Sequence, residues 1–118
     1  MGEASDELTV AEVQRIVDRW IGRFKEGYFP PLAMVARLAE EVGELAREVN
    51  HTYGPKPKKP DEPPGSVAEE LGDLLFVLAS MANALDIDLA QAFLSAMQKF
   101  HERDGQRWTP QVNAPGTE

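Results

Sequence analysis

The sequence contains no cysteine and only two histidines among its 118 residues. The absence of thiols excludes disulfide bonds, thiolate catalysis and zinc–thiolate sites. Basic residues are also scarce, because 12 Lys and Arg stand against 20 Asp and Glu and leave a formal net charge of -8. This charge argues against a nucleic acid duplex as a partner. A protein this acidic needs a cation between itself and any phosphate that it binds.

Long hydrophobic runs are missing too. The longest, Leu74 to Leu85, is interrupted by Ser80 and Asn83, and it is far shorter than the ~20 apolar residues that cross a bilayer. No membrane role is therefore expected. The acidic start, Met1 to Asp6, lacks the basic and apolar stretches of a secretory signal, which favours a cytoplasmic protein. The length suits a single domain, which a partner subunit would help to stabilise.

Four segments show helical periodicity, and none alternates apolar and polar residues as a β-strand does. Capping-box sequences at Thr9 and Ser66 open the first and third helices, and Pro30 and Pro31 separate the first from the second. The second helix is expected from Leu32 to about Asn50, the third ends near Leu85, and the fourth extends from a cap at Asp88 to about Gly105. These patterns predict an all-α, four-helix bundle-like chain with helices two and three as a central antiparallel hairpin.

The apolar positions predict which residues face the core. Trp20 and Phe24 of the first helix are expected there, although aromatic rings at this spacing can also stack on a nucleobase. Gly43 and Gly72 lie inside helices, where glycine costs about 1 kcal/mol, so a second helix is expected to pack closely against each. In the fourth helix the residues expected to point inward are Leu89, Ala92, Phe93, Ala96, Met97 and Phe100.

One domain is expected over residues 1–108, followed by a disordered tail over 109–118. Within the domain, residues 52–65 are rich in proline and predict a stiff, extended loop. Its lysines, Lys56, Lys58 and Lys59, either close over phosphates or are simply solvated. The two histidines, His51 and His101, have no partner that the sequence identifies.

The second and third helices contain an internal repeat. Ala39-Glu-Glu-Val-Gly-Glu-Leu45 and Ala68-Glu-Glu-Leu-Gly-Asp-Leu74 differ only by Leu for Val and Asp for Glu. Acids three apart share a helix face, beside the apolar stripe. If the two stripes pack together, two acid pairs come to lie opposite each other. These pairs are Glu41 with Glu44 and Glu70 with Asp73.

Four carboxylates that converge in this way repel one another unless a cation neutralises them. A ligand set made only of oxygen atoms suits the hard ion Mg2+, with Mn2+ as a substitute, better than zinc or copper. A single Glu-x-x-Glu pair is usually a solvated surface pair, but two matched pairs on adjacent helices favour a metal site. Glu40, Glu48 and Glu69 are ambiguous, because each can support a ligand, act as a general base or be solvated.

These motifs resemble the MazG-like nucleotide pyrophosphohydrolases, within the all-α NTP pyrophosphatase group. The family motif, Glu-Glu-x-x-Glu followed by Glu-x-x-Asp, is matched at residues 40–44 and 70–73, and the resemblance extends from about Val10 to Trp108. The segments 24–29, 45–51 and 103–108 resemble the short single-domain bacterial members in particular. The resemblance implies a MazG-like domain over residues 1–108 that forms homodimers or homotetramers.

The resemblance also implies roles for individual residues. Glu41, Glu44, Glu70 and Asp73 would be Mg2+ ligands and, with Glu40, catalytic residues. A Lys-Phe-x-x-Arg sequence in the last helix would place Lys99 and Arg103 on the substrate phosphates. The reaction would convert a nucleoside triphosphate and water into a nucleoside monophosphate and pyrophosphate, as in the clearance of aberrant nucleotides.

Two other classes remain open from the residues alone. A ferritin-like carboxylate metal protein also gathers acids from four helices, but it needs two Glu-x-x-His motifs. This sequence has one, which ends at His51. The second alternative is a non-catalytic helical dimerisation module in which the acids form a solvated seam. Failure to bind magnesium would favour that alternative.

Overall fold

The computed structural model describes residues 7–55, 58–62 and 65–111 of the chain. Within these ranges the protein is all-α and forms four helices: α1 (Val10–Ile21), α2 (Pro31–Tyr53), α3 (Val67–Ala84) and α4 (Leu89–Asp104). The predicted helices and their order are confirmed. Helix α2 continues through Tyr53, so the loop predicted over 52–65 begins two residues later. Most of the tail predicted over 109–118 lies outside the described residues.

The helix boundaries follow from local chemistry. The Thr9 hydroxyl accepts a hydrogen bond from the Glu12 backbone N–H (3.1 Å), while Glu12 Oε1 accepts one from the Thr9 N–H (2.8 Å). Both halves of the predicted capping box are therefore present at the start of α1. Pro31 occupies the first position of α2, where a missing N–H costs nothing. Two further side-chain caps accept backbone N–H groups, Ser66 from Glu69 (3.0 Å) and Asp88 from Gln91 (3.2 Å).

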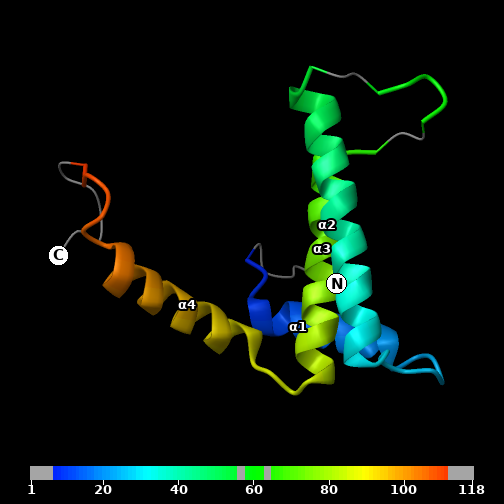
Figure 1. Ribbon diagram of the computed structural model, residues 1–118. Coiled ribbons are helices and arrows are strands. Elements are labelled where there is room, and N and C mark those ends of the chain that lie inside the picture. Colours follow the sequence, from blue (N-terminus) through cyan, green and yellow to red (C-terminus); the bar gives the residue numbers. More distant parts are fainter. Residues whose placement is uncertain (1–6, 56–57, 63–64, 112–118) are drawn as a thin grey trace.

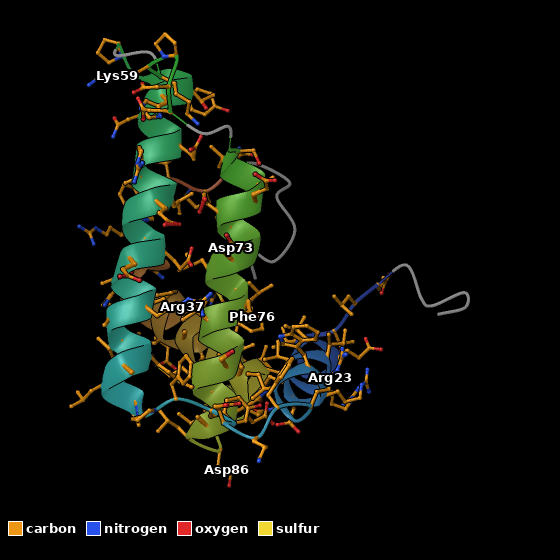
Figure 2. All side chains as sticks on the ribbon, turned by 90° about the vertical axis from the view of Figure 1, so that its right-hand side faces the viewer. Arg23, Arg37, Lys59, Asp73, Phe76 and Asp86 are labelled. Atoms are coloured by element: carbon orange, nitrogen blue, oxygen red, sulfur yellow. The ribbon has the colours of Figure 1, made fainter. Side chains whose placement is uncertain are left out.

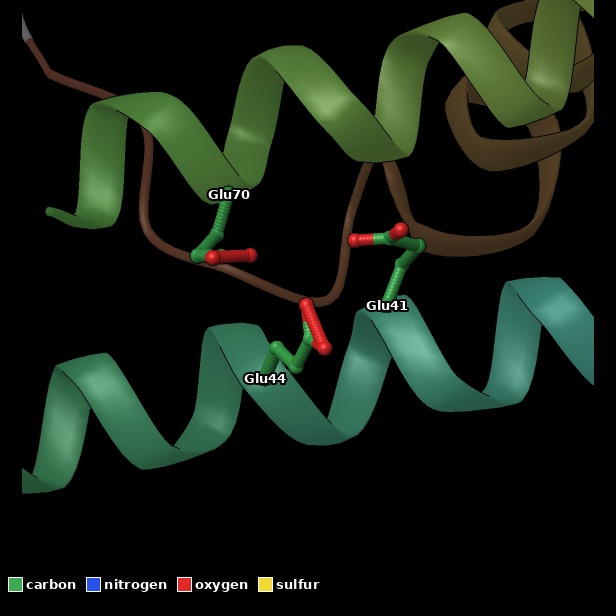
Figure 3. Close-up of side chains that lie close together, drawn as sticks. All are labelled: Glu41, Glu44 and Glu70. Atoms are coloured by element: carbon green, nitrogen blue, oxygen red, sulfur yellow. The ribbon is translucent and has the colours of Figure 1, made fainter. Parts of the chain in front are cut away.

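Helices α2 and α3 form the antiparallel hairpin, and α1 lies across the end at which α2 begins and α3 ends (Figure 1). The core is concentrated where these three helices meet. Its buried apolar residues are Val17, Met34, Val77, Ala79 and Ala82. Toward the opposite end of the hairpin, where α2 ends and α3 begins (Figure 1), acidic side chains of the two helices face each other (Figure 3). The fold therefore separates an apolar end from an acidic end.

Helix α4 projects away from the hairpin and packs mainly on α1 (Figure 1). Its apolar side chains are exposed, with 56% of Phe93 and 47% of Met97 accessible. The prediction that this face points into the core is wrong for the single chain. A turn at Asp86, whose φ of 59° is left-handed, lies between α3 and α4, and beyond it α4 packs mainly on α1.

Two further expectations about packing are also wrong for the single chain. Trp20 and Phe24 are about half exposed. A Cβ atom added to Gly43 or Gly72 would meet nothing within 4 Å, so none of the four described helices packs closely against either glycine. None of the described helices is long and apolar enough to cross a membrane.

Candidate metal centre and active site

Three carboxylates meet across the hairpin, near its acidic end. Glu41 and Glu44 point from α2 toward Glu70 on α3 (Figure 3). One carboxylate oxygen from each of the three residues lies within 4.8 Å of the other two. The predicted convergence of the two acid pairs is thus present for these three members. Helical spacing explains it, because residues 41 and 44 lie on the α2 face that packs against α3.

The carboxylates of Glu41 and Glu70 are both partly withdrawn from water. Glu41 is only 8% exposed, and one oxygen of each residue is buried without a hydrogen-bond partner among the described residues. Burial raises the pKa of Glu41, and the neighbouring charges of Glu44 and Asp73 raise it further. Burial likewise raises the pKa of Glu70, with added repulsion from Glu44, Asp73 and Glu41. The cluster is therefore electrostatically unfavourable unless a cation neutralises it.

The fourth predicted ligand, Asp73 (Figure 2), lies three residues after Glu70 on α3, about one helical turn away. It is exposed and does not belong to the cluster of three, yet its charge acts on both Glu41 and Glu70. Asp73, Glu44 and Glu70 also line a common pocket of about 430 Å³. Glu48 and Glu69 line this pocket as well, whereas Glu40 is exposed and is not among its lining residues.

The residues of this centre fit a hard divalent cation. Carboxylate oxygens are the ligands that magnesium and manganese prefer, and the pocket supplies several of them at short mutual distance. One oxygen of Glu41 and one of Glu70 are buried with no hydrogen-bond partner in the described part of the chain, and a bound cation would satisfy both. This donor set agrees with the Mg2+ requirement that the resemblance of the sequence implies.

Sequence reasoning missed two polar contacts that attach the proline-rich loop to α2. Lys58 Nζ lies 3.1 Å from Glu48 Oε2 and 3.3 Å from Glu48 Oε1. His51 Nε2 lies 3.6 Å from Glu62 Oε2, so His51 does have a partner. Loop contacts of this kind depend on the path of the loop, which local sequence does not specify. Lys56 lies outside the described residues.

These pairs also bear on the ferritin-like alternative. That class needs a histidine beside the carboxylate cluster. In this chain His51 is engaged with Glu62 of the loop, and it is not a member of the cluster of three carboxylates. The single Glu-x-x-His sequence therefore serves the loop attachment, and nothing in the described residues supplies a second one.

A second cavity, of about 490 Å³, lies beside the apolar end of the hairpin. Its wall includes five aromatic residues, Trp20, Phe24, Tyr28, Phe29 and Phe76. Trp20 and Phe24 pack edge to face with ring centroids 5.2 Å apart. Trp20 and Phe24, which were predicted to lie in the core, thus form part of the wall of a cavity.

Two polar contacts organise the aromatic cavity. The Tyr28 hydroxyl donates a 2.6 Å hydrogen bond to Asp18, which fixes the turn after α1; burial and this bond raise the pKa of Tyr28 to about 12. Arg37 lines the cavity and also lies 3.6 Å from Glu41 Oε2. Arg37 and Phe76 lie on the facing helices α2 and α3 (Figure 2). Arg37 therefore connects the aromatic cavity to the acidic cluster.

The two cations predicted to bind phosphate are on α4, away from the acidic cluster of the same chain (Figure 1). Lys99 and Arg103 both lie over the ring of Phe100, at 5.2 Å and 5.4 Å. Arg103 also pairs with Asp104 at 2.9 Å. They share a helix face, as predicted, but the single chain does not bring that face to the pocket.

Comparison with known proteins identifies the family. The model of the MazG nucleotide pyrophosphohydrolase domain matches residues 29–108, which include all of α2 and α3 and every acidic residue that lines the pocket. The chain belongs to the MazG nucleotide pyrophosphohydrolase family. It is accordingly an enzyme of a class that hydrolyses phosphoanhydride bonds, and the predicted family resemblance is confirmed.

Individual relatives agree with this assignment. The chain is 61% identical to the uncharacterized protein YpjD of Bacillus subtilis, over 87% of this chain and 93% of that protein. It is 30% identical to mouse (Mus musculus) dCTP pyrophosphatase 1, over 84% of this chain but only 61% of the mouse protein.

Two solved structures share the fold, each with a TM-score of 0.72. The crystal structure of YpjD is 61% identical in sequence and is matched over 81% of this chain and 97% of that chain. The structure of the Bacillus-conserved MazG protein, described as a nucleotide pyrophosphohydrolase, is 54% identical and is matched over 85% of this chain and 97% of that chain. The MazG architecture of four helices is therefore established for this protein.

Proposed function

We propose that this MazG protein is a magnesium-dependent nucleoside triphosphate pyrophosphohydrolase that releases pyrophosphate and leaves the monophosphate. The observation that carries the proposal is the meeting of Glu41, Glu44 and Glu70, with two buried carboxylate oxygens that lack a partner among the described residues. Glu41, Glu44, Glu70 and Asp73 would hold the ion. Bound Mg2+ offsets the charge of the triphosphate and lowers the pKa of a water ligand.

The chain itself offers no obvious covalent nucleophile. It has no cysteine, and His51 is turned toward Glu62 of the loop. Water is therefore the attacking group, and direct displacement at the α-phosphorus needs no covalent intermediate. Glu48 and Glu69 line the pocket, where a carboxylate can accept the proton that the water releases. Glu40, exposed beyond this lining, is the weaker candidate for that role.

The aromatic cavity suits the nucleobase. Flat aromatic walls favour stacking, and a cavity of about 490 Å³ is within the size range of small-molecule sites. Arg37 links this cavity to Glu41, so one nucleotide can extend from the rings to the acidic pocket. In this arrangement the triphosphate lies over the carboxylates and the base lies at the apolar end of the hairpin.

A homodimer or homotetramer is the proposed working form. The radius of gyration of the single chain is 18.2 Å, against about 13–14 Å expected for a compact domain of this length. Large apolar side chains of α4 remain exposed, and a second copy that covers them would carry Lys99 and Arg103 with it. We propose that these two cations reach the substrate phosphates in the assembly.

The test is a panel of nucleoside triphosphates assayed for pyrophosphate release, with Mg2+ and with a chelator. The wild type should release pyrophosphate only when the ion is present, and Asp73→Asn should not. A protein that neither binds Mg2+ nor releases pyrophosphate would favour the non-catalytic dimerisation module. Clearance of aberrant nucleotides predicts faster turnover of modified bases than of ordinary ones in the same panel.

A further inference from the structure

The acidic pocket is lined by a lysine, Lys58, whose side chain is positively charged. The Lys58 ammonium group is within 3.1–3.3 Å of both Glu48 carboxylate oxygens and lines the pocket together with Glu44, Glu70 and Asp73. Only 24% of the Lys58 side chain and 12% of the Glu48 side chain are exposed. Lysines in surface loops usually extend into water. The position of Lys58 is therefore a specific feature of this pocket.

We propose that Lys58 binds the triphosphate, and that its ammonium group moves from Glu48 to a phosphate oxygen when the nucleotide enters. This inference rests on the proposed pyrophosphohydrolase function and adds a substrate-binding residue to it. It assigns the proline-rich loop to substrate recognition. The movement required is small, because the lysine already points into the pocket that the phosphates would enter.

Charge balance supports this assignment. The pocket is lined by six carboxylates, and the only cations among its lining residues are Lys58 and Arg47. A triphosphate adds further negative charge, so its binding is favoured by an ammonium group that is already in place. The chain's other predicted phosphate ligands, Lys99 and Arg103, lie on α4, far from this pocket in the single chain (Figure 1). Lysine suits a change of partner, because its charge is compact and its stem is flexible.

The loop has a second attachment that does not depend on Lys58. Glu62 accepts a 2.8 Å hydrogen bond from the Lys59 N–H and lies 3.6 Å from His51. These contacts keep the loop on α2 while the Lys58 ammonium exchanges Glu48 for phosphate. If Lys58 served only to anchor the loop, it would repeat the attachment that Glu62 and His51 already provide.

The experiment compares Lys58→Met with Lys59→Met, a matched loss of charge at the next position of the same loop, where the side chain is exposed (Figure 2). Binding of a non-hydrolysable α,β-imido deoxynucleoside triphosphate is measured by calorimetry in saturating Mg2+, beside steady-state kinetics with the hydrolysable nucleotide. Loss of one charge-assisted hydrogen bond should raise Kd and KM about 10- to 100-fold in Lys58→Met. Lys59→Met should stay within about twofold of the wild type, as surface substitutions do.

Glu48→Gln separates substrate binding from simple anchoring. It removes the carboxylate of the ion pair but keeps the Lys58 ammonium group. The Kd of the non-hydrolysable analogue, which reports binding and not the proton transfer considered for Glu48, should therefore not rise. Magnesium binding without nucleotide, followed by the shift in melting temperature, should not weaken in Lys58→Met, because the substitution removes a competing positive charge. That shift also shows that the variant is folded.

Three results would overturn the assignment. Equal weakening in Lys58→Met and Glu48→Gln would show that the ion pair only anchors the loop. Unchanged analogue binding in Lys58→Met, with an active wild type, would overturn the role of Lys58 and leave the proposed function in place. A wild type that neither binds the analogue nor releases pyrophosphate would overturn both.

Discussion

Glu41 on α2 and Glu70 on α3 direct carboxylate oxygens into one small volume, and each has an oxygen that is buried without a partner among the described residues. A long loop separates the two helices in sequence. Glu41 and Glu70 therefore come together because the apolar face of α2 packs against that of α3. The folding energy of the hairpin thus holds together charges that repel each other. A protein that maintains such an arrangement is prepared for a cation.

Removal of one charge from this cluster should separate activity from stability. Glu44→Gln and Asp73→Asn are each expected to abolish pyrophosphate release, while the metal-free melting temperature stays the same or rises by a few degrees. The reason is that each variant removes repulsion from Glu41 and Glu70. Glu102→Gln, an exposed acid on α4, is the matched control and should change neither quantity. A clear loss of metal-free stability in Asp73→Asn would show that Asp73 has a structural partner instead.

The pH dependence of stability follows from the raised pKa values of Glu41 and Glu70. A carboxyl group whose pKa is higher in the folded state binds protons more readily there, so its contribution favours folding at low pH. This contribution is fully present below the ordinary pKa of 4.5 and is lost as the pH rises through the raised pKa of the folded state.

The measurement is the free energy of unfolding of the metal-free protein across this range, for the wild type and for Glu41→Gln. The difference between the two should shift in favour of the variant as the pH rises, and saturating Mg2+ should suppress the effect. A difference that does not change with pH would contradict a raised pKa at Glu41. Comparison with the variant is needed because Glu12 and Glu62 have lowered pKa values, which act in the opposite direction.

The sequence was sufficient to predict the helices and the acidic centre because both depend on local rules. Capping residues such as Thr9 and Asp88 specify where helices begin, and a spacing of three places Glu41 and Glu44 on one face. The repeat in the third helix then located Glu70 and Asp73. No knowledge of the tertiary path was needed beyond the packing of two adjacent helices.

The failures concern contacts that local sequence does not determine. The direction of α4 depends on the turn at Asp86, and an apolar face such as that of Phe93 can cover either its own chain or a second copy. Trp20 was assigned to the core from the spacing of apolar residues along its helix. That spacing is the same whether a side chain is buried in the core or lines a cavity. The pairing of Lys58 with Glu48 depends on the fold of a loop.

Trp20 should report nucleotide binding if the aromatic cavity receives the base. Trp108, the other tryptophan, is replaced by phenylalanine so that Trp20 is the only source of indole fluorescence. Addition of a non-hydrolysable nucleoside triphosphate with Mg2+ should quench or shift this emission in a saturable way, since a stacked base alters the surroundings of the ring. Inorganic triphosphate, which lacks a base, is the control and should leave the spectrum unchanged. Equal responses to both would place the base elsewhere.

The exposed face of α4 should matter for assembly. Phe93→Glu combined with Met97→Glu places two charges on side chains that are 56% and 47% exposed in the single chain. If a second copy covers this face, the variant should lose apparent mass in light scattering coupled to size-exclusion chromatography. Ser95→Glu, on another face of α4, is the matched control and should retain the wild-type mass. An unchanged mass in the double variant would assign the assembly to a different surface.

The most direct test of the central claim is product analysis in water labelled with oxygen-18. If water attacks the α-phosphorus of a nucleoside triphosphate at the Glu41, Glu44, Glu70 and Asp73 centre, the products are a labelled monophosphate and unlabelled pyrophosphate. Mass spectrometry of the two products distinguishes this outcome from the others. Label in pyrophosphate would place the attack at the β-phosphorus, and release of orthophosphate with a nucleoside diphosphate would contradict the proposed reaction itself.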